Sequence, residues 1–86
     1  MKNYVKALED FNKAIELHDD YPECYYYRGL TLNKLGSYPD AIEDFMRALE
    51  LKSRFEGSIY NGLGFSYNKL KDFSKALHVI PSYQAS

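Results

Sequence analysis

Apolar residues recur along the chain at helical spacing. Near the start they follow the i, i+3, i+4, i+7 pattern of an amphipathic helix, with polar side chains on the opposite side: Tyr4, Ala7, Leu8, Phe11, Ala14, Ile15 and Leu17. The same kind of pattern continues to the end of the sequence. It predicts an all-α fold with five helices, at about 4–18, 22–35, 38–52, 57–70 and 73–80. Pro81 should end the last helix and leave an irregular tail.

Local signals support these helix ends. Asn3, Ser37 and Asp72 directly precede an apolar stripe, and their side chains are good caps for the unpaired N–H groups of a first helical turn. Pro22 suits the first turn of the second helix, where its missing N–H costs little. Gly36 supplies the left-handed residue that often ends a helix. The stretch from 22 to 38 therefore predicts a helix followed by a tight turn.

The sequence repeats itself. The segment 4–17 recurs at 38–51, with every matched pair 34 positions apart, and it starts a third time at Phe73. A second segment, 25–35, recurs at 60–70 with an offset of 35 positions. A period of this length is typical of solenoids built from helical hairpins.

Small and aromatic residues alternate within the repeat. Gly29 and Gly64 lie in the middle of predicted helices, where glycine costs roughly 1 kcal/mol relative to alanine. We therefore expect a second helix to approach closely at both glycines, with Ala7, Ala41 and Ala76 as the flat surfaces of the following helices. Bulky residues should fill the space between helices, among them Phe11, Phe45 and the recurring tyrosines Tyr4, Tyr25, Tyr38, Tyr60 and Tyr67.

This pattern resembles the tetratricopeptide repeat (TPR), a ~34-residue unit of two antiparallel helices. The middle unit reads Tyr25, Arg28-Gly29, Leu32, Ala41, Phe45, Ala48, and the last reads Tyr60, Leu63-Gly64, Tyr67, Ala76, Ile80. Arg28 stands where the family usually has leucine. The resemblance implies a right-handed superhelical stack of antiparallel helix pairs over residues 1–80. Its parts would be the second helix of a partial repeat (3–21), a complete repeat (22–56) and a truncated repeat (57–80), followed by the tail 81–86.

The resemblance also implies a function. TPR arrays are non-enzymatic scaffolds that hold a peptide or partner helix in a concave groove lined by the first helix of each repeat. We therefore expect a protein or peptide partner, no catalysis and no cofactor. The expected groove residues are Tyr26, Tyr27, Leu30, Asn33 and Lys34 in one helix, with Glu23 before them, and Asn61, Phe65, Asn68 and Lys69 in the next, with Ser58 before them. Alternatively, these side chains pack against a neighbouring repeat or a capping helix.

Composition narrows the class of partner. Eleven basic and twelve acidic residues give a net charge of −1, which argues against nucleic acid and against an anionic membrane surface as partners. No apolar run approaches the ~20 residues of a membrane span. The single cysteine, Cys24, cannot form an internal disulfide. His18-Asp19-Asp20 fits a helix end better than a metal site. We expect an intracellular, cytoplasmic protein.

The predicted first helix raises an alternative function. It has no hairpin partner of its own, so its apolar stripe should be partly uncovered: Tyr4, Leu8, Phe11 and Ile15. Leaving three such side chains in water forfeits roughly 5 kcal/mol, at ~1.5–3 kcal/mol each. That rivals the whole stability of a small domain. The alternative is therefore a structural element that stacks on further repeats or forms a homo-oligomer through its open ends.

Overall fold

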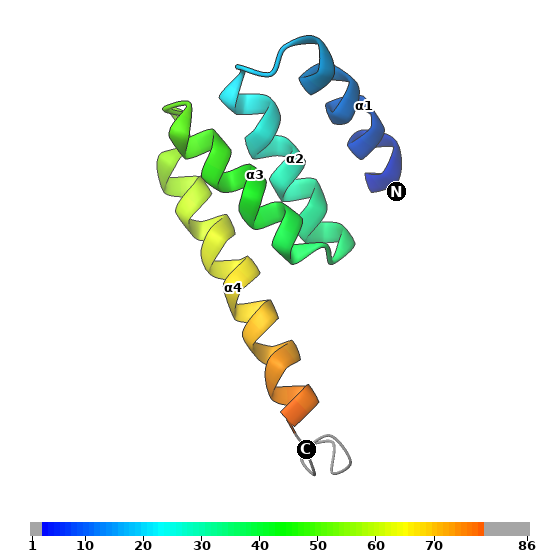
Figure 1. Cartoon of the computed structure of the whole chain (residues 1–86), viewed down its shortest axis with the longest axis vertical. Helices are drawn as coiled ribbons and strands as arrows, with labels where there is room; N and C mark the ends of the chain where they lie inside the picture. The colour runs from blue at the N-terminus through cyan, green and yellow to red at the C-terminus, as the bar shows by residue number, and fades with distance from the viewer. Residues whose placement is uncertain (1–2, 79–86) are drawn as a thin grey trace.

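The computed structural model describes residues 3–78, and this part of the chain is all-helical. Its four helices are α1 (Tyr4–Leu17), α2 (Pro22–Leu35), α3 (Tyr38–Glu50) and α4 (Glu56–His78). Helices that follow one another in sequence lie side by side, and α2 also contacts α4 (Figure 1). The all-α prediction is confirmed for these residues. None of the four helices is both long and apolar enough to cross a membrane.

Most of the predicted end signals act as expected. The Asn3 side chain accepts a 2.9 Å hydrogen bond from a backbone N–H in the first turn of α1. Helix α2 begins at Pro22 and ends at Leu35, and the φ of 83° at the next residue, Gly36, lies in the left-handed region that glycine tolerates best. The Ser37 side chain makes no capping hydrogen bond, so that part of the prediction is wrong. Lys52, with φ of 63°, takes the left-handed conformation after α3.

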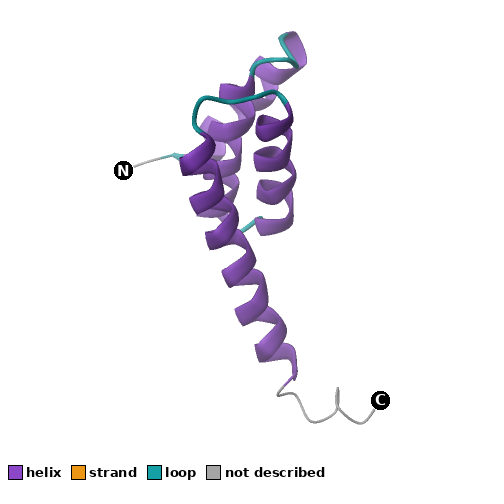
Figure 2. Ribbon diagram, turned by 90° about the vertical axis from the view of Figure 1, so that its left-hand side faces the viewer, coloured by secondary structure: helices purple, strands orange, loops and turns teal. Residues whose placement is uncertain are grey.

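The predicted break between helices 57–70 and 73–80 is absent. Helix α4 runs without interruption from Glu56 to His78, and Asp72, the predicted cap, lies inside it. The position that corresponds to Gly36 is occupied by Lys71, for which a left-handed turn costs roughly 1–2 kcal/mol. The end of α4 therefore extends beyond α2 and α3 (Figure 1 and Figure 2). The predicted helix end at 80 and the tail 81–86 lie outside the described residues.

The core lies between α2, α3 and α4. It consists of Tyr25, Tyr26, Leu32, Ala41, Phe45, Ala48, Ile59 and Leu63. Phe45 is fully buried, and a Cβ atom at Gly29 of α2 would lie only 2.8 Å from its ring. A Cβ atom at Gly62 of α4 would lie 2.6 Å from the same ring. Two glycines therefore make room for one phenylalanine between three helices.

Two predictions about packing in α4 are wrong. Gly64 is exposed, and no described atom lies within 4 Å of where its Cβ would be, so the close approach occurs at Gly62 instead. Tyr60 and Tyr67 are 57% and 54% exposed, whereas Tyr25, the counterpart of Tyr60, is buried. The reason is the continuous α4: helix α3 folds back over Tyr25, but no described helix folds back over Tyr60.

Candidate functional site

A groove of about 320 Å³ runs between α2 and α4. Four residues of α2 line one wall, and four residues of α4 line the other: Tyr26, Leu30, Asn33 and Lys34, and Ser58, Asn61, Gly62 and Phe65. Equivalent helices of two successive units thus contribute one wall each. We call this feature the α2–α4 groove.

The α2–α4 groove combines apolar surface with amide and cationic groups. Phe65 is 46% exposed, and the edge of Tyr38 contacts its ring at a centroid distance of 6.1 Å. Leu30 is half-buried in the opposite wall. The Nζ atom of Lys69 lies 5.5 Å from the centroid of the Phe65 ring, a cation–π distance. Lys34 and Asn61 are exposed.

Asn33 lies at the base of the groove and connects its walls. The side chain is buried, its Nδ2 donates to the Gly62 carbonyl at 3.3 Å, and its Oδ1 accepts from the Ser66 hydroxyl at 2.6 Å. The Ser66 hydroxyl is also 3.0 Å from the Gly62 carbonyl, but its single proton serves one acceptor at a time. Asn33 therefore fixes the spacing of α2 and α4.

Tyr26 forms part of the wall rather than an exposed contact. It is only 9% exposed, and its ring stacks on Phe55 at a centroid distance of 4.9 Å and lies 6.3 Å from that of Phe45. Tyr26 therefore lines the groove and belongs to the core at the same time, and its contact with a partner stays a prediction. Tyr27, the next residue, is 43% exposed.

A second hollow, of about 240 Å³, adjoins the groove. It lies between α1 and α2 and is lined by Tyr4, Phe11, Tyr27, Leu30, Thr31 and Lys34. Leu30 and Lys34 line both spaces, so the two lie next to each other along α2. The ring of Tyr27 stacks with Phe11 at 6.2 Å. Tyr27 therefore lines the neighbouring hollow toward α1 and not the α2–α4 groove.

The structure brings six of the nine expected contact residues together in the α2–α4 groove: Tyr26, Leu30, Asn33, Lys34, Asn61 and Phe65. Tyr27 lines the adjoining hollow, and Asn68 and Lys69 are exposed on α4 without lining the groove. Gly62 was missed. Its spacing from Ser58 and Phe65, at i+4 and i−3, is the signal that could have placed it on the same helix face. Whether these residues bind a partner stays a prediction.

The apolar stripe of α1 is half-buried. All four of its expected members, Tyr4, Leu8, Phe11 and Ile15, are partly covered, and Leu8 and Ile15 pack against the core. Val5 and Leu17 of the same helix are 58% and 75% exposed. The stripe therefore attaches α1 to the rest of the fold and leaves part of the helix uncovered.

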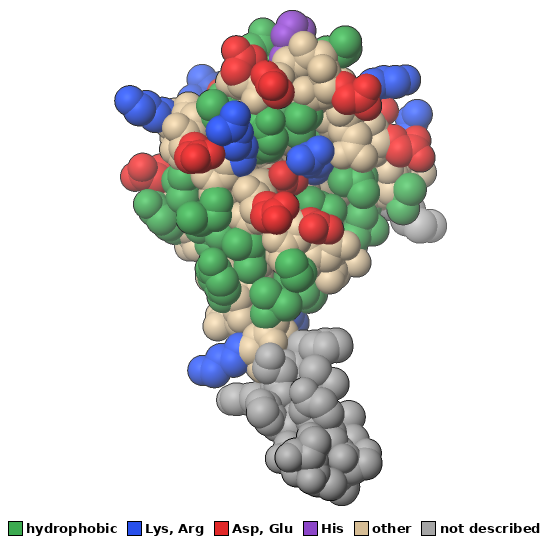
Figure 3. Space-filling view, in the orientation of Figure 1, with side chains coloured by type: hydrophobic (Ala, Val, Ile, Leu, Met, Phe, Trp, Pro, Cys, Tyr) green, Lys and Arg blue, Asp and Glu red, His purple; other side chains and the backbone are tan. Residues whose placement is uncertain are grey.

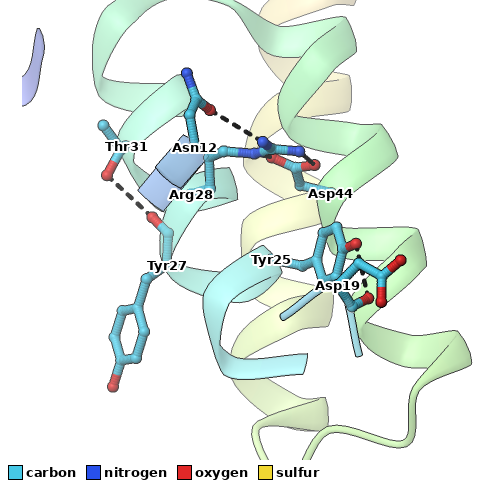
Figure 4. A network of polar contacts seen from close by, with 7 residues as sticks. All are labelled: Asn12, Asp19, Tyr25, Tyr27, Arg28, Thr31 and Asp44. Atoms are coloured by element: carbon cyan, nitrogen blue, oxygen red, sulfur yellow. Dashed lines mark hydrogen bonds and ion pairs between the residues drawn. The ribbon is translucent and has the colours of Figure 1, made fainter. Parts of the chain in front are cut away.

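An ion-pair network lies away from the groove (Figure 4). Arg28 binds Asp44 of α3 with two hydrogen bonds, from Nε at 2.7 Å and from Nη2 at 2.8 Å, and its Nη1 donates to Asn12 of α1 at 3.0 Å. The hydrogen bond to Asp44 raises the pKa of Arg28 above its ordinary value, against the opposing effect of burial. The guanidinium also lies 5.7 Å from the ring centroid of Tyr25.

This network explains why arginine replaces the usual leucine of the repeat. Its charge neutralises Asp44, whose side chain is 7% exposed, and its reach connects α1, α2 and α3. The hollow of about 260 Å³ beside it is lined mostly by polar residues. We therefore assign Arg28 a structural role.

On the face seen in Figure 3, charges of both signs alternate over the upper part of the molecule, and hydrophobic side chains gather below them.

Within the described residues, no group of three or more His, Cys, Asp or Glu is placed to hold a metal ion. His18 stacks on Tyr21 at a centroid distance of 5.0 Å, at the end of α1. Cys24 is half-buried and unpaired in the first turn of α2. Nothing in this part of the chain points to catalysis.

Comparison with known proteins agrees with this geometry. The family model described as tetratricopeptide repeat matches residues 22–55. An uncharacterized protein of Methanocaldococcus jannaschii is 43% identical over 56 residues, 65% of this chain and 65% of that protein. Tetratricopeptide repeat protein 13 of Homo sapiens is 38% identical over 66 residues, 77% of this chain and 8% of that protein. Small glutamine-rich tetratricopeptide repeat-containing protein 2 of Mycosarcoma maydis is 31% identical over 88 residues, 94% of this chain and 25% of that protein.

The match thus spans less than two thirds of each of these relatives. No solved structure matches the chain. Residues 22–55, which the tetratricopeptide repeat model matches, run from the start of α2 through α3. In this unit the chain is similar to the tetratricopeptide repeat family, as the names of two of these relatives also indicate. The family is in general one of non-enzymatic protein-interaction modules, and such repeats present extended binding surfaces.

Proposed function

We propose that the α2–α4 groove binds an extended peptide or a helix of a partner protein. The observation that carries this proposal is the joint lining of one groove by equivalent helices of two units, with Phe65 46% exposed in its wall. A half-exposed phenylalanine near a buried tyrosine and a half-buried leucine offers a partner side chain a pocket from which water can be expelled.

The polar groups of the groove favour backbone recognition. Asn61 is exposed and makes no side-chain hydrogen bond to another described residue, so its amide can donate to and accept from a peptide backbone. The Asn33 amide is committed to Gly62 and Ser66 and keeps the walls in place. The groove can therefore bind an extended peptide, with Asn61 as the hydrogen-bonding partner of the peptide backbone.

The charges favour an acidic partner. Lys34 and Lys69 are exposed near Phe65, and neither forms an ion pair with a described side chain. A ligand with an apolar anchor followed by a carboxylate could occupy the Phe65 pocket and neutralise these two cations. Because both lysines are solvated, we expect charge to affect the association rate and the salt dependence more than the affinity.

The test uses short random peptides displayed on phage and selected on the intact chain. The best binders are then synthesised with a fluorophore and titrated by fluorescence anisotropy. We expect Phe65→Ala to weaken binding by about tenfold or more, which corresponds to at least ~1.4 kcal/mol. Tyr21→Ala is the matched control, because Tyr21 is a 51% exposed aromatic residue outside the groove. Equal binding by the two variants would refute the proposal.

A second candidate function is assembly through α1, either with further repeats or with another copy. The observation that favours it is the apolar surface left uncovered on α1 at Val5 and Leu17. If α1 is the contact, Val5→Glu combined with Leu17→Glu should abolish self-association in sedimentation velocity experiments. A chain that is a monomer at tens of micromolar would exclude self-association through α1.

A further inference from the structure

One face of α4 is apolar and exposed. Tyr60, Gly64 and Tyr67 follow one another at i, i+4 and i+7, so they share one side of the helix. The two tyrosines are 57% and 54% exposed, and Gly64 between them is exposed as well. We call these three residues the open α4 face. It is distinct from the α2–α4 groove, which none of them lines.

The structure shows what covers the same face one unit earlier. Tyr25, Gly29 and Leu32 stand 35 positions before the residues of the open α4 face, and all three are buried under α3. Phe45 of α3 packs on Gly29, which has no side chain to obstruct it. Helix α3 begins with the segment 38–42, and this segment is fixed against α2 by the turn at Gly36.

The chain contains a second copy of that covering segment. Residues 73–77 repeat residues 38–42, with Ala76 at the position of Ala41, which is 0% exposed in the core. However, α4 continues through Lys71 and Asp72 as a single helix, so residues 73–77 extend away from the open α4 face of their own chain (Figure 1 and Figure 2). A straight helix cannot fold back onto itself.

We propose that a second copy of this chain supplies the missing cover. Residues 73–77 of each copy pack on the open α4 face of the other at its Tyr67 end, and the two α4 helices lie antiparallel around a two-fold axis near residue 72. The contact is reciprocal, as a two-fold interface requires, and it exchanges one repeat element between copies. Tyr67 of each copy thereby gains the packing that the start of α3 gives Leu32 of α2. This dimer goes beyond the proposed groove function and does not rest on it.

The first test is the mass of the intact chain in solution. Sedimentation equilibrium should show reversible association of the 10.0 kDa chain into a dimer. Tyr67→Ala should raise the dissociation constant about tenfold or more while the far-ultraviolet circular dichroism stays unchanged, since this side chain is 54% exposed in the single copy. Tyr21→Ala, an exposed tyrosine elsewhere, should leave it unchanged. A chain that is still a monomer at about 100 µM, and so has a dissociation constant well above that concentration, would overturn the proposal.

A cross-link decides which copy supplies the cover. Leu32 and Ala41 lie in one buried cluster, and their counterparts are Tyr67 and Ala76. The variant Cys24→Ser, Tyr67→Cys, Ala76→Cys should form a disulfide between two chains on mild oxidation. The control places the first cysteine at exposed Asn68 instead of Tyr67 and should cross-link less. A disulfide within one chain, or none in excess of the control, would overturn the proposal.

Discussion

The Ser66 hydroxyl lies 2.6 Å from Oδ1 of Asn33, and this buried hydrogen bond joins α4 to α2 across 33 positions of the sequence. The same Asn33 side chain donates to the Gly62 carbonyl. All three residues are buried, so the bond is shielded from competing water. It sets the separation of the two helices that form the α2–α4 groove.

Replacing Asn33 with alanine should therefore destabilise the fold and the groove together. The change removes both hydrogen bonds and leaves the Gly62 carbonyl buried without the amide donor. We expect a loss of roughly 1–3 kcal/mol in the free energy of unfolding, measured by urea denaturation. Asn68→Ala, an exposed asparagine on α4, is the control and should change stability by less than about 0.5 kcal/mol. Similar effects of the two substitutions would show that the buried bridge contributes nothing.

Gly29→Ala tests the close approach of Phe45 to α2. The new Cβ would lie 2.8 Å from a fully buried ring that has little room to move, because Gly62 confines it from the other side. We expect overpacking to exceed the gain in helix propensity and to cost a net ~1–2 kcal/mol in thermal or urea unfolding.

Gly57→Ala is the matched control for that substitution. No described atom lies within 4 Å of a Cβ at Gly57, which is exposed in the first turn of α4. Here the change should be neutral or stabilise by up to ~1 kcal/mol. If Gly29→Ala also stabilises, the packing of Phe45 is looser than these distances indicate.

Arg28→Leu, which restores the residue usual for the repeat, should destabilise this chain. It leaves the Asp44 carboxylate, with 7% of its side chain exposed, without its bidentate partner. Breaking a buried pair in this way costs about 3 kcal/mol, at the low end of the usual range because Arg28 is partly exposed. In a double-mutant cycle, Arg28→Leu with Asp44→Ala should recover part of that loss. A double variant as unstable as the sum of the singles would mean that the two side chains are not coupled.

The repeat period and the apolar stripes predict most of this fold. Positions 34 or 35 apart share an environment wherever the neighbouring helix is present, as for Tyr4 and Tyr38, which are both half-buried. The prediction fails where that neighbour is missing: Tyr60 matches Tyr25 in sequence, but nothing described covers it. A repeat pattern indicates which helix surfaces can pack together, but it does not indicate whether the partner helix comes from the same chain or from another.

The other differences between the predicted and the observed fold depend on single residues. The turn after α2 depends on Gly36 in a left-handed conformation, and Lys71 at the corresponding place allows α4 to continue. The difference between glycine and lysine at these two matched positions is visible in the sequence, so the uninterrupted α4 could have been predicted. The pairing of Arg28 with Asp44 could also be predicted from the sequence, because a hairpin turning at Gly36 brings residues eight positions on either side of it close together. The burial of Tyr26 could not be predicted, since it depends on Phe55 in the connection after α3.

The groove residues were predictable as one helix face, but their roles were not. Leu30 and Asn33 lie on the same side of α2, yet Leu30 is only half-buried while Asn33 is committed to two hydrogen bonds with α4. Periodicity places a residue on a face. Whether it remains available to a partner depends on the distance to the next helix.

The measurement that tests the central claim most directly is nuclear magnetic resonance of the ¹⁵N-labelled chain with a selected peptide. If the α2–α4 groove is the binding site, the largest shift changes should fall on Leu30, Lys34, Asn61 and Phe65, and Phe65→Ala should remove them. Changes centred on Arg28 and Asp44, or spread evenly over the chain, would contradict the account.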